Sequence, residues 1–287
     1  MLLFCLILAH LIADFYLQTD EMVKDKINYI KKHIGHHFLM NGLVLIVFYM
    51  FNNKEIGIIN NLIILLLFIG ISHYFIDFLK IKLQNTIKFS NEENLNQVSF
   101  FIIDQLLHLV CILLAGQFFL GIDLAGIHKF FLDGEKLSTV NAVLFTLIVI
   151  IFATTVSGYL IKILLGSLPN QLLTFEGKYT FKNERQEALY TKNYNGNRAL
   201  AEEYNYTIFG KHDLSRGKLI GYLERLLVLV LTFYSAYPAI GFIVAAKSIA
   251  RFKQMDDRNW AEYFLLGTLT SMFIGITLGI LLREVLT

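Results

Sequence analysis

The sequence predicts an all-α fold, a polytopic integral membrane bundle of about seven or eight transmembrane helices. Of the 287 residues, 55% are hydrophobic and only 17% are charged, with a mean hydropathy of +0.56, whereas soluble domains carry roughly 25% charged residues. Several apolar stretches approach or exceed the roughly 20 residues that a helix needs to cross a bilayer. Stretches such as 62–71 and 147–153 are continuously apolar, which favours helices over the alternating strands of a membrane barrel.

The apolar stretches define the expected helices in chain order. Seven crossings are predicted, and residues 238–252 form either an eighth crossing or a re-entrant helix. The seven crossings are 1–18, 34–52, 57–81, 97–122, 139–166, 218–236 and 260–284. Pro169 and Pro238 fall at segment ends, where proline disturbs a helix least. The first stretch has neither a basic start nor a small-residue cleavage site, so we expect it to be retained and not removed as a signal peptide.

A polar segment divides the chain into two membrane blocks. Residues 1–166 are expected to form a five-helix block that carries the His/Asp residues discussed below, and residues 218–287 a C-terminal helical block. The segment between them, 167–217, is too polar to bury a core of its own. We expect a surface loop or lid there, with a short helix around 199–204. The alternative is that this loop binds a partner or gates a substrate.

The distribution of lysine and arginine predicts the orientation, because cytoplasmic loops carry an excess of both. With eight crossings, 20 of the 25 basic residues fall on the side reached after the first helix, four fall on the opposite side, and Arg225 lies within a span. The sequence therefore predicts a multi-pass protein of the cell membrane with a cytoplasmic 167–217 loop and both termini outside. The basic residues form no basic-aromatic stripe, so nucleic acid is not an expected partner.

Three histidine–aspartate pairs lie inside apolar runs in the first 108 residues. The pairs are His10/Asp14, His73/Asp77 and, in reversed order, Asp104/His108. Both members of a pair project from one helix face, because four residues make about one helical turn. His36 and His37, preceded by His33, begin the second span at a similar predicted depth. Antiparallel helices would thus place all of these polar groups in one layer.

Ionisable groups at membrane depth are costly and indicate a functional site. A divalent ion prefers neutral imidazole and carboxylate ligands, and the carboxylates also offset its charge. The sequence therefore predicts an intramembrane site for one or two ions of zinc, manganese or iron. The candidate ligands are His10, Asp14, His36, His37, His73, Asp77, Asp104 and His108. The alternatives are metal-free interhelical pairing, a proton or ion relay, and a histidine box of the di-iron lipid oxidases, suggested by the string from His33 to His37.

Basic residues near the predicted site suggest an anionic substrate. Lys80 lies seven residues after His73 and hence near the same helix face. In the C-terminal block, Glu224 and Arg225 interrupt an apolar run. Two hypotheses stay open for that block: a charge network that docks the two halves, or a site whose basic residues bind an anionic headgroup or phosphate. The candidate substrate-binding residues are Lys80, Arg225, Lys247 and Arg251.

Several strings in the sequence carry a family likeness. AHLIADFYLQ at 9–18, HYFID at 73–77 and DQLLH at 104–108 resemble a bacterial integral membrane family catalogued as domain of unknown function 3307, over about residues 1–120. The strings at 217–225 and 239–249 look like the C-terminal extension of longer members. The resemblance implies a multi-helix protein of the bacterial inner membrane and no established reaction.

The predicted function is metal-dependent hydrolysis of a lipid or phosphoester at the inner leaflet. A metal-bound water would be the nucleophile, and an aspartate or histidine that does not bind the metal would be the general base. One alternative is an ion- or proton-coupled transporter or channel that uses the same residues as a relay. The other is a non-catalytic membrane scaffold whose cytoplasmic loop binds a partner. Membrane lipids are expected partners in every case.

Overall fold

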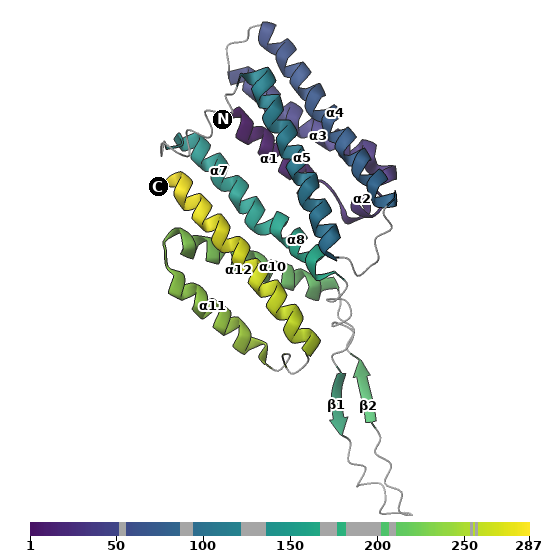
Figure 1. The fold of residues 1–287 in the computed structure, drawn as a ribbon, viewed down its shortest axis with the longest axis vertical. Helices are drawn as coiled ribbons and strands as arrows, with labels where there is room; N and C mark the ends of the chain where they lie inside the picture. Colours follow the sequence, from purple (N-terminus) through teal and green to yellow (C-terminus); the bar gives the residue numbers. More distant parts are fainter. Residues whose placement is uncertain are drawn as a thin grey trace, which may run out of the picture.

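The computed structural model of the chain is a bundle of long helices with a small two-stranded sheet beyond one end (Figure 1). It describes residues 1–51, 56–86, 94–121, 136–166, 177–181, 202–206, 211–252, 255 and 258–287. The first helices are α1 Leu2–Phe15, α2 Asp20–Lys24, α3 Lys26–Phe51, α4 Ile56–Thr86 and α5 Asn94–Leu120. The later ones are α7 Thr139–Ile151, the π-helix η1 Phe152–Val156, α8 Ser157–Leu165, α10 Lys211–Phe233, α11 Tyr237–Ala250 and α12 Arg258–Leu286.

Five helical stretches among the described residues are long and apolar enough to cross a membrane. They are Lys26–Phe51, Asn61–Gln84, Asn94–Leu120, Thr139–Leu165 and Trp260–Leu286. α1 and α11 are apolar but have only 14 residues each, and α10 carries two charged residues in its apolar part. The fold is a helical membrane bundle, as predicted, whereas the number of seven or eight crossings stays a prediction.

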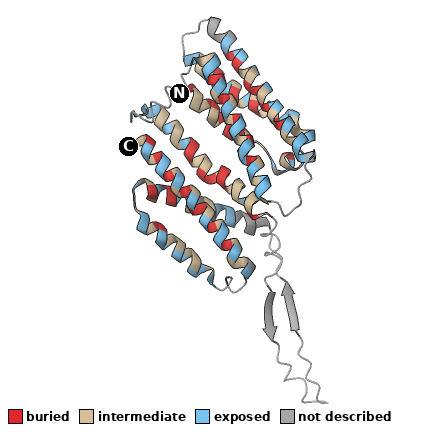
Figure 2. Cartoon of the chain, in the orientation of Figure 1, coloured by how far each residue is buried: buried red, intermediate tan, exposed pale blue. Residues whose placement is uncertain are grey.

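The outer surface of the bundle is rich in large apolar side chains. Ile71, Phe75 and Phe118 are among those that are more than half exposed. Figure 2 shows the buried residues as stripes along the helices, with exposed residues on the remaining faces. Soluble proteins rarely expose large continuous apolar surfaces, whereas lipid chains solvate them without cost.

Clusters of buried apolar side chains connect the helices from the N-terminal to the C-terminal part of the chain. One cluster, centred on Leu6, Leu65 and Ala115, joins α1, α3, α4 and α5. A second joins α1 and α5 to the helical stretch α7–η1–α8. That stretch packs in turn against α10 and α12 through a third cluster. The stretch α7–η1–α8 therefore lies between the N-terminal and the C-terminal helices (Figure 1), and the division into blocks at 166 and 218 stays a prediction.

Small residues let α10 and α12 pack closely. Gly275 and Gly279 lie one turn apart on α12 and face α10. A Cβ atom placed on Gly279 would lie 2.6 Å from the Cβ of Thr232 and 2.9 Å from the carbonyl oxygen of Leu229. A larger residue would therefore push the two helices apart, as expected for small-residue contacts between membrane helices.

Part of the polar 167–217 segment forms a sheet. β1 Gly177–Phe181 pairs antiparallel with β2 Glu202–Tyr206, with Tyr179 opposite Tyr204. The predicted short helix around 199–204 is therefore wrong from residue 202 onward. The sequences GKYTF and EEYNY contain tyrosine and threonine, which favour strands when a partner strand is present. Apart from this sheet, every regular element among the described residues is helical.

Candidate metal centre

Four helices bring buried polar side chains into one layer of the N-terminal bundle. They are His10 and Asp14 of α1, His33 and His37 of α3, His73 and Asp77 of α4, and Asp104 and His108 of α5. Within each helix the two residues are four apart, so both project from the same face. None of these side chains is more than 9% exposed. Buried ionisable groups in such number need mutual pairing or a bound ion.

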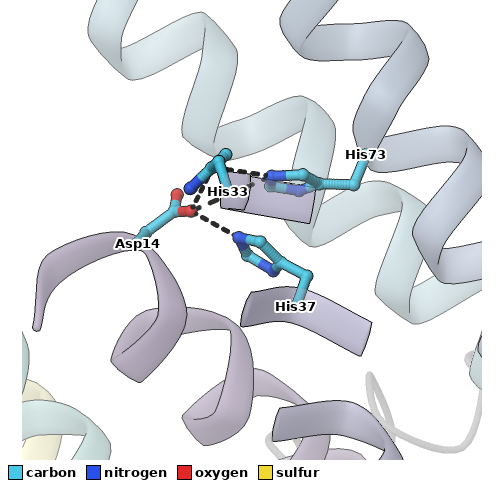
Figure 3. Close-up of side chains that lie close together, drawn as sticks. All are labelled: Asp14, His33, His37 and His73. Carbon is cyan, nitrogen blue, oxygen red and sulfur yellow. Dashed lines mark hydrogen bonds and ion pairs between the residues drawn. The ribbon is translucent and has the colours of Figure 1, made fainter. Parts of the chain in front are cut away.

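The centre of the cluster consists of Asp14, His33, His37 and His73 (Figure 3). The Asp14 Oδ1 atom lies 2.9 Å from His37 Nε2 and 3.4 Å from His33 Nε2. His33 Nε2 lies 3.1 Å from His73 Nε2, and His73 Nε2 lies 3.9 Å from Asp14 Oδ1. Ligand atoms around a tetrahedral zinc ion are roughly 3.3 Å apart. These four spacings are close to those of a metal coordination shell, and all four ligand atoms lie within 4.8 Å of one another.

A second potential ligand group shares His73. His73, Asp77 and His108 place one donor atom each within 4.8 Å of one another. His73 Nε2 is 3.4 Å from Asp77 Oδ2, and His33 Nε2 is 3.3 Å from the same oxygen. The two groups are therefore contiguous, because Asp77 of the second group also lies beside His33 of the first.

The tautomer of His108 follows from its backbone contact. Its Nδ1 atom lies 2.9 Å from the carbonyl oxygen of Asp104. A carbonyl only accepts, so Nδ1 carries the proton and Nε2 is the free lone-pair donor. This Nε2 atom is buried and has no hydrogen-bond partner among the described residues. A backbone hydrogen bond of this kind is how many metal-binding histidines are oriented.

His10 packs beside both groups without joining either. Its ring centroid lies 5.2 Å from that of His37, 5.4 Å from that of His73 and 5.1 Å from that of His108. Its Nε2 atom is 3.6 Å from Asp14 Oδ2, too far for a hydrogen bond. His10 is thus placed to support the ligands or to reach an ion after a small side-chain movement.

Amide and ammonium groups surround the carboxylates. The Gln105 side chain donates to Asp14 Oδ2 at 3.0 Å. Lys80 donates to Asp104 Oδ2 at 2.6 Å, so Lys80, which we predicted to meet a substrate, is already paired in this structure. The third carboxylate, on Asp77, faces the ammonium group of Lys26, whose side chain is 22% exposed.

Five of the predicted ligands fall in the two groups. They are Asp14, His37, His73, Asp77 and His108. Asp104 lies beside the groups and binds a lysine, and the two groups do not include His36. His33 takes the place that we predicted for His36, because His33 and His37 are four residues apart, whereas His36 points about 100° away from His37 around the helix. The same four-residue spacing in the three His/Asp pairs is the signal that favours His33.

Arg225 belongs to a different part of the structure, between α10 and η1. It is 4% exposed, and its guanidinium donates to main-chain and hydroxyl oxygens. The acceptors are the carbonyl groups of Ala153 and Thr154 and the hydroxyl of Ser271. The first two acceptors are in the π-helix, where the wider hydrogen-bonding pattern alters the backbone spacing. The contacts join α10 to η1 and α12, as the docking hypothesis expects.

The other C-terminal basic residues also have local roles. Lys247 of α11 donates to Glu224 of α10 at 2.7 Å. Arg251 follows α11 and lines a shallow pocket with Trp260 and Phe264. Neither residue contacts the His/Asp cluster in any interaction of the described residues. Their binding of an anionic headgroup stays a prediction.

A comparison with protein families matches the part of the chain that contains the cluster. Residues 2–132 match the model of a family described as "Protein of unknown function (DUF3307)". The match contains all the residues of the cluster and confirms the resemblance inferred from the three motifs. No curated protein and no solved structure matches the chain. The function is therefore argued from the site itself.

Proposed function

We propose that Asp14, His33, His37 and His73 bind a divalent transition-metal ion inside the N-terminal helical bundle. The observation that carries this proposal is that one carboxylate and three imidazoles place one ligand atom each within 4.8 Å of one another, with four of the separations between 2.9 and 3.9 Å. Mixed nitrogen and oxygen ligands suit zinc, manganese and iron. The adjacent group of His73, Asp77 and His108 supplies either outer-shell partners or ligands for a second ion.

The carboxylates of the layer would offset part of the charge of a bound cation. The layer holds three carboxylates, on Asp14, Asp77 and Asp104, and two ammonium groups, on Lys26 and Lys80. With neutral imidazoles, the net charge without an ion is therefore −1. One divalent cation would bring the net charge to +1, and it would be bound by the facing Nε2 atoms of His33 and His73, which lie 3.1 Å apart.

We further propose that the centre hydrolyses a lipid or phosphoester substrate reached from the inner leaflet. A bound divalent ion would polarise the ester and lower the pKa of a coordinated water. Asp77 or His108, where it is not itself a ligand, accepts the proton of the attacking water, and that proton then passes to the leaving oxygen. The two ligand groups share His73, which supports a base of the second group acting next to an ion in the first.

The packing beyond the layer favours hydrolysis over an ion or proton relay. A relay needs polar groups along the whole path across the membrane. In the described part of the same four helices, Asn41 is buried one turn from His37, and beyond it lies the apolar cluster that includes Leu6, Leu45 and Leu65. These leucine side chains are fully or almost fully buried and offer no donor or acceptor for a proton.

Protein purified without a histidine tag is expected to contain one or two equivalents of zinc, manganese or iron by elemental analysis. The metal-loaded protein should hydrolyse a phosphodiester or a phospholipid, lose the activity with a chelator and regain it on addition of metal. Absence of metal after gentle purification and attempted reloading would refute the proposed function. Bound metal combined with proton flux in vesicles, and without hydrolysis, would favour the relay.

The orientation proposed for the chain places residues 167–217 in the cytoplasm and both termini outside. The two termini lie at one end of the bundle, and the β1–β2 sheet extends from the other end (Figure 1), which supports opposite sides for the termini and this segment, whereas the excess of lysine and arginine assigns the segment to the cytoplasm. A cysteine at Asn195, in a background lacking Cys5 and Cys111, should resist an impermeant thiol reagent in intact cells and react after lysis. Ready labelling of intact cells would reverse the orientation.

A further inference from the structure

A small pocket leads from the protein surface to the edge of the metal centre. Its lining includes Gln18, Met22, Lys26, Tyr29, His33 and Asp77. The last two are cluster residues, whereas the Lys26 side chain is 22% exposed. The pocket reaches the proposed metal ligands, and its volume of about 10 Å³ holds one water-sized group, such as a single phosphate oxygen.

We infer that one oxygen of a phosphodiester enters this pocket and that Lys26, at the exposed edge of the pocket, is the residue that binds the phosphate, an inference that rests on the metal centre proposed above. The Lys26 Nζ atom lies 3.7 Å from Asp77 Oδ1, beyond hydrogen-bonding distance. An ammonium group with such a loose contact can donate to an incoming anion without first breaking a strong pair. Lys80 is different, because its ammonium group lies 2.6 Å from a carboxylate oxygen of Asp104.

The charge of the layer points to a singly charged anion. Three carboxylates and two ammonium groups leave a net charge of −1, which one divalent ion changes to +1. A phosphodiester carries one negative charge and neutralises the site, whereas a carboxylic ester or an amide leaves the positive charge buried and uncompensated. A phosphomonoester dianion would instead leave a surplus negative charge.

Other groups in the pocket suit the same ligand. The Gln18 amide and the Tyr29 hydroxyl, which line the pocket, can both donate hydrogen bonds to an anion. Met22, which is 2% exposed, provides an apolar wall. Phosphodiesters occur both in phospholipid headgroups and in soluble molecules, and both sources share the chemistry that this pocket recognises.

The test compares Lys26→Gln with Lys31→Gln in the full-length, metal-loaded protein. Lys31 is exposed on the same helix and outside the pocket lining, so it controls for the loss of one positive charge. Dibutyl phosphate binding, measured by calorimetry, should weaken about 10-fold or more in Lys26→Gln, because a charge-assisted hydrogen bond is lost. Lys31→Gln should bind as the wild type does, Lys26→Arg should retain most of the affinity, and metal content should be equal in all variants.

Three outcomes would overturn the inference, and they are distinguishable. Equal affinity of wild type and Lys26→Gln, with metal present, would exclude Lys26 as the phosphate-binding residue and leave the metal centre intact. Loss of metal in Lys26→Gln would show that Lys26 acts through the centre. A wild type that holds no metal would refute the proposed function itself. Competition by phosphatidylglycerol in mixed micelles would identify the lipid source, and binding of dibutyl phosphate without that competition would identify a soluble diester; both support the inference.

Discussion

Replacing His33 with alanine is expected to raise the Kd for the metal more than about 100-fold, beyond the effect typical of outer-shell partners. The reason is geometric, since His33 Nε2 lies 3.4 Å from Asp14 Oδ1, 3.1 Å from His73 Nε2 and 3.3 Å from Asp77 Oδ2. It is therefore in contact with both ligand groups. Competition with a chromophoric chelator would measure the Kd.

His36→Ala is the matched control for this experiment. His36 lies on the same helix, only partly buried and outside both ligand groups, so its removal should leave the Kd unchanged. A combined loss of metal in both variants would indicate a general defect of α3, which thermal unfolding of the metal-free proteins would detect. Loss of metal in His36→Ala alone would show that His36 binds the metal, as the sequence predicts, and that His33 does not occupy the place shown in Figure 3.

Arg225→Gln is expected to lower the free energy of unfolding by roughly 3–5 kcal/mol, because two hydrogen bonds from a charged donor to buried carbonyl groups are lost and each contributes about 1.5–3 kcal/mol. The guanidinium is almost completely buried and donates to two carbonyl oxygens of the π-helix. Without it, those carbonyl groups lose their interhelical donors in a place where water does not easily replace them. Thermal or denaturant unfolding in detergent would measure the change.

Metal content separates a docking role of Arg225 from a role in the site. Folded Arg225→Gln protein should keep its metal, because the contacts of Arg225 lie on α7–η1–α8, α10 and α12 and not in the His/Asp layer. Arg258→Gln serves as control, because Arg258 is exposed and forms only a surface pair with Glu262, and it should unfold like the wild type. Unchanged stability of Arg225→Gln would mean that this side chain is solvated.

Much of the fold is predictable because the relevant physics is local. Runs of about 20 apolar residues become membrane helices wherever they occur, because a lipid environment leaves the backbone no partner except itself. The polar 167–217 segment is harder, because the pairing of 177–181 with 202–206 depends on a contact between residues distant in the sequence. A short tyrosine-rich string such as EEYNY is compatible with a helix turn or a strand until its partner is known.

The sequence by itself determined the membrane class and the four-residue spacing that puts histidine and aspartate on one helix face, since both depend only on composition and helical periodicity. Only the tertiary structure decided which of these faces meet. The rotation of α3 about its axis turns His33, and not His36, toward Asp14. The position of α5 lets Asp104 pair with Lys80, whereas Lys26 lines the pocket. The packing of α10 against η1 provides the carbonyl groups that accept from Arg225. These choices depend on side-chain packing between helices, which a one-dimensional pattern does not contain.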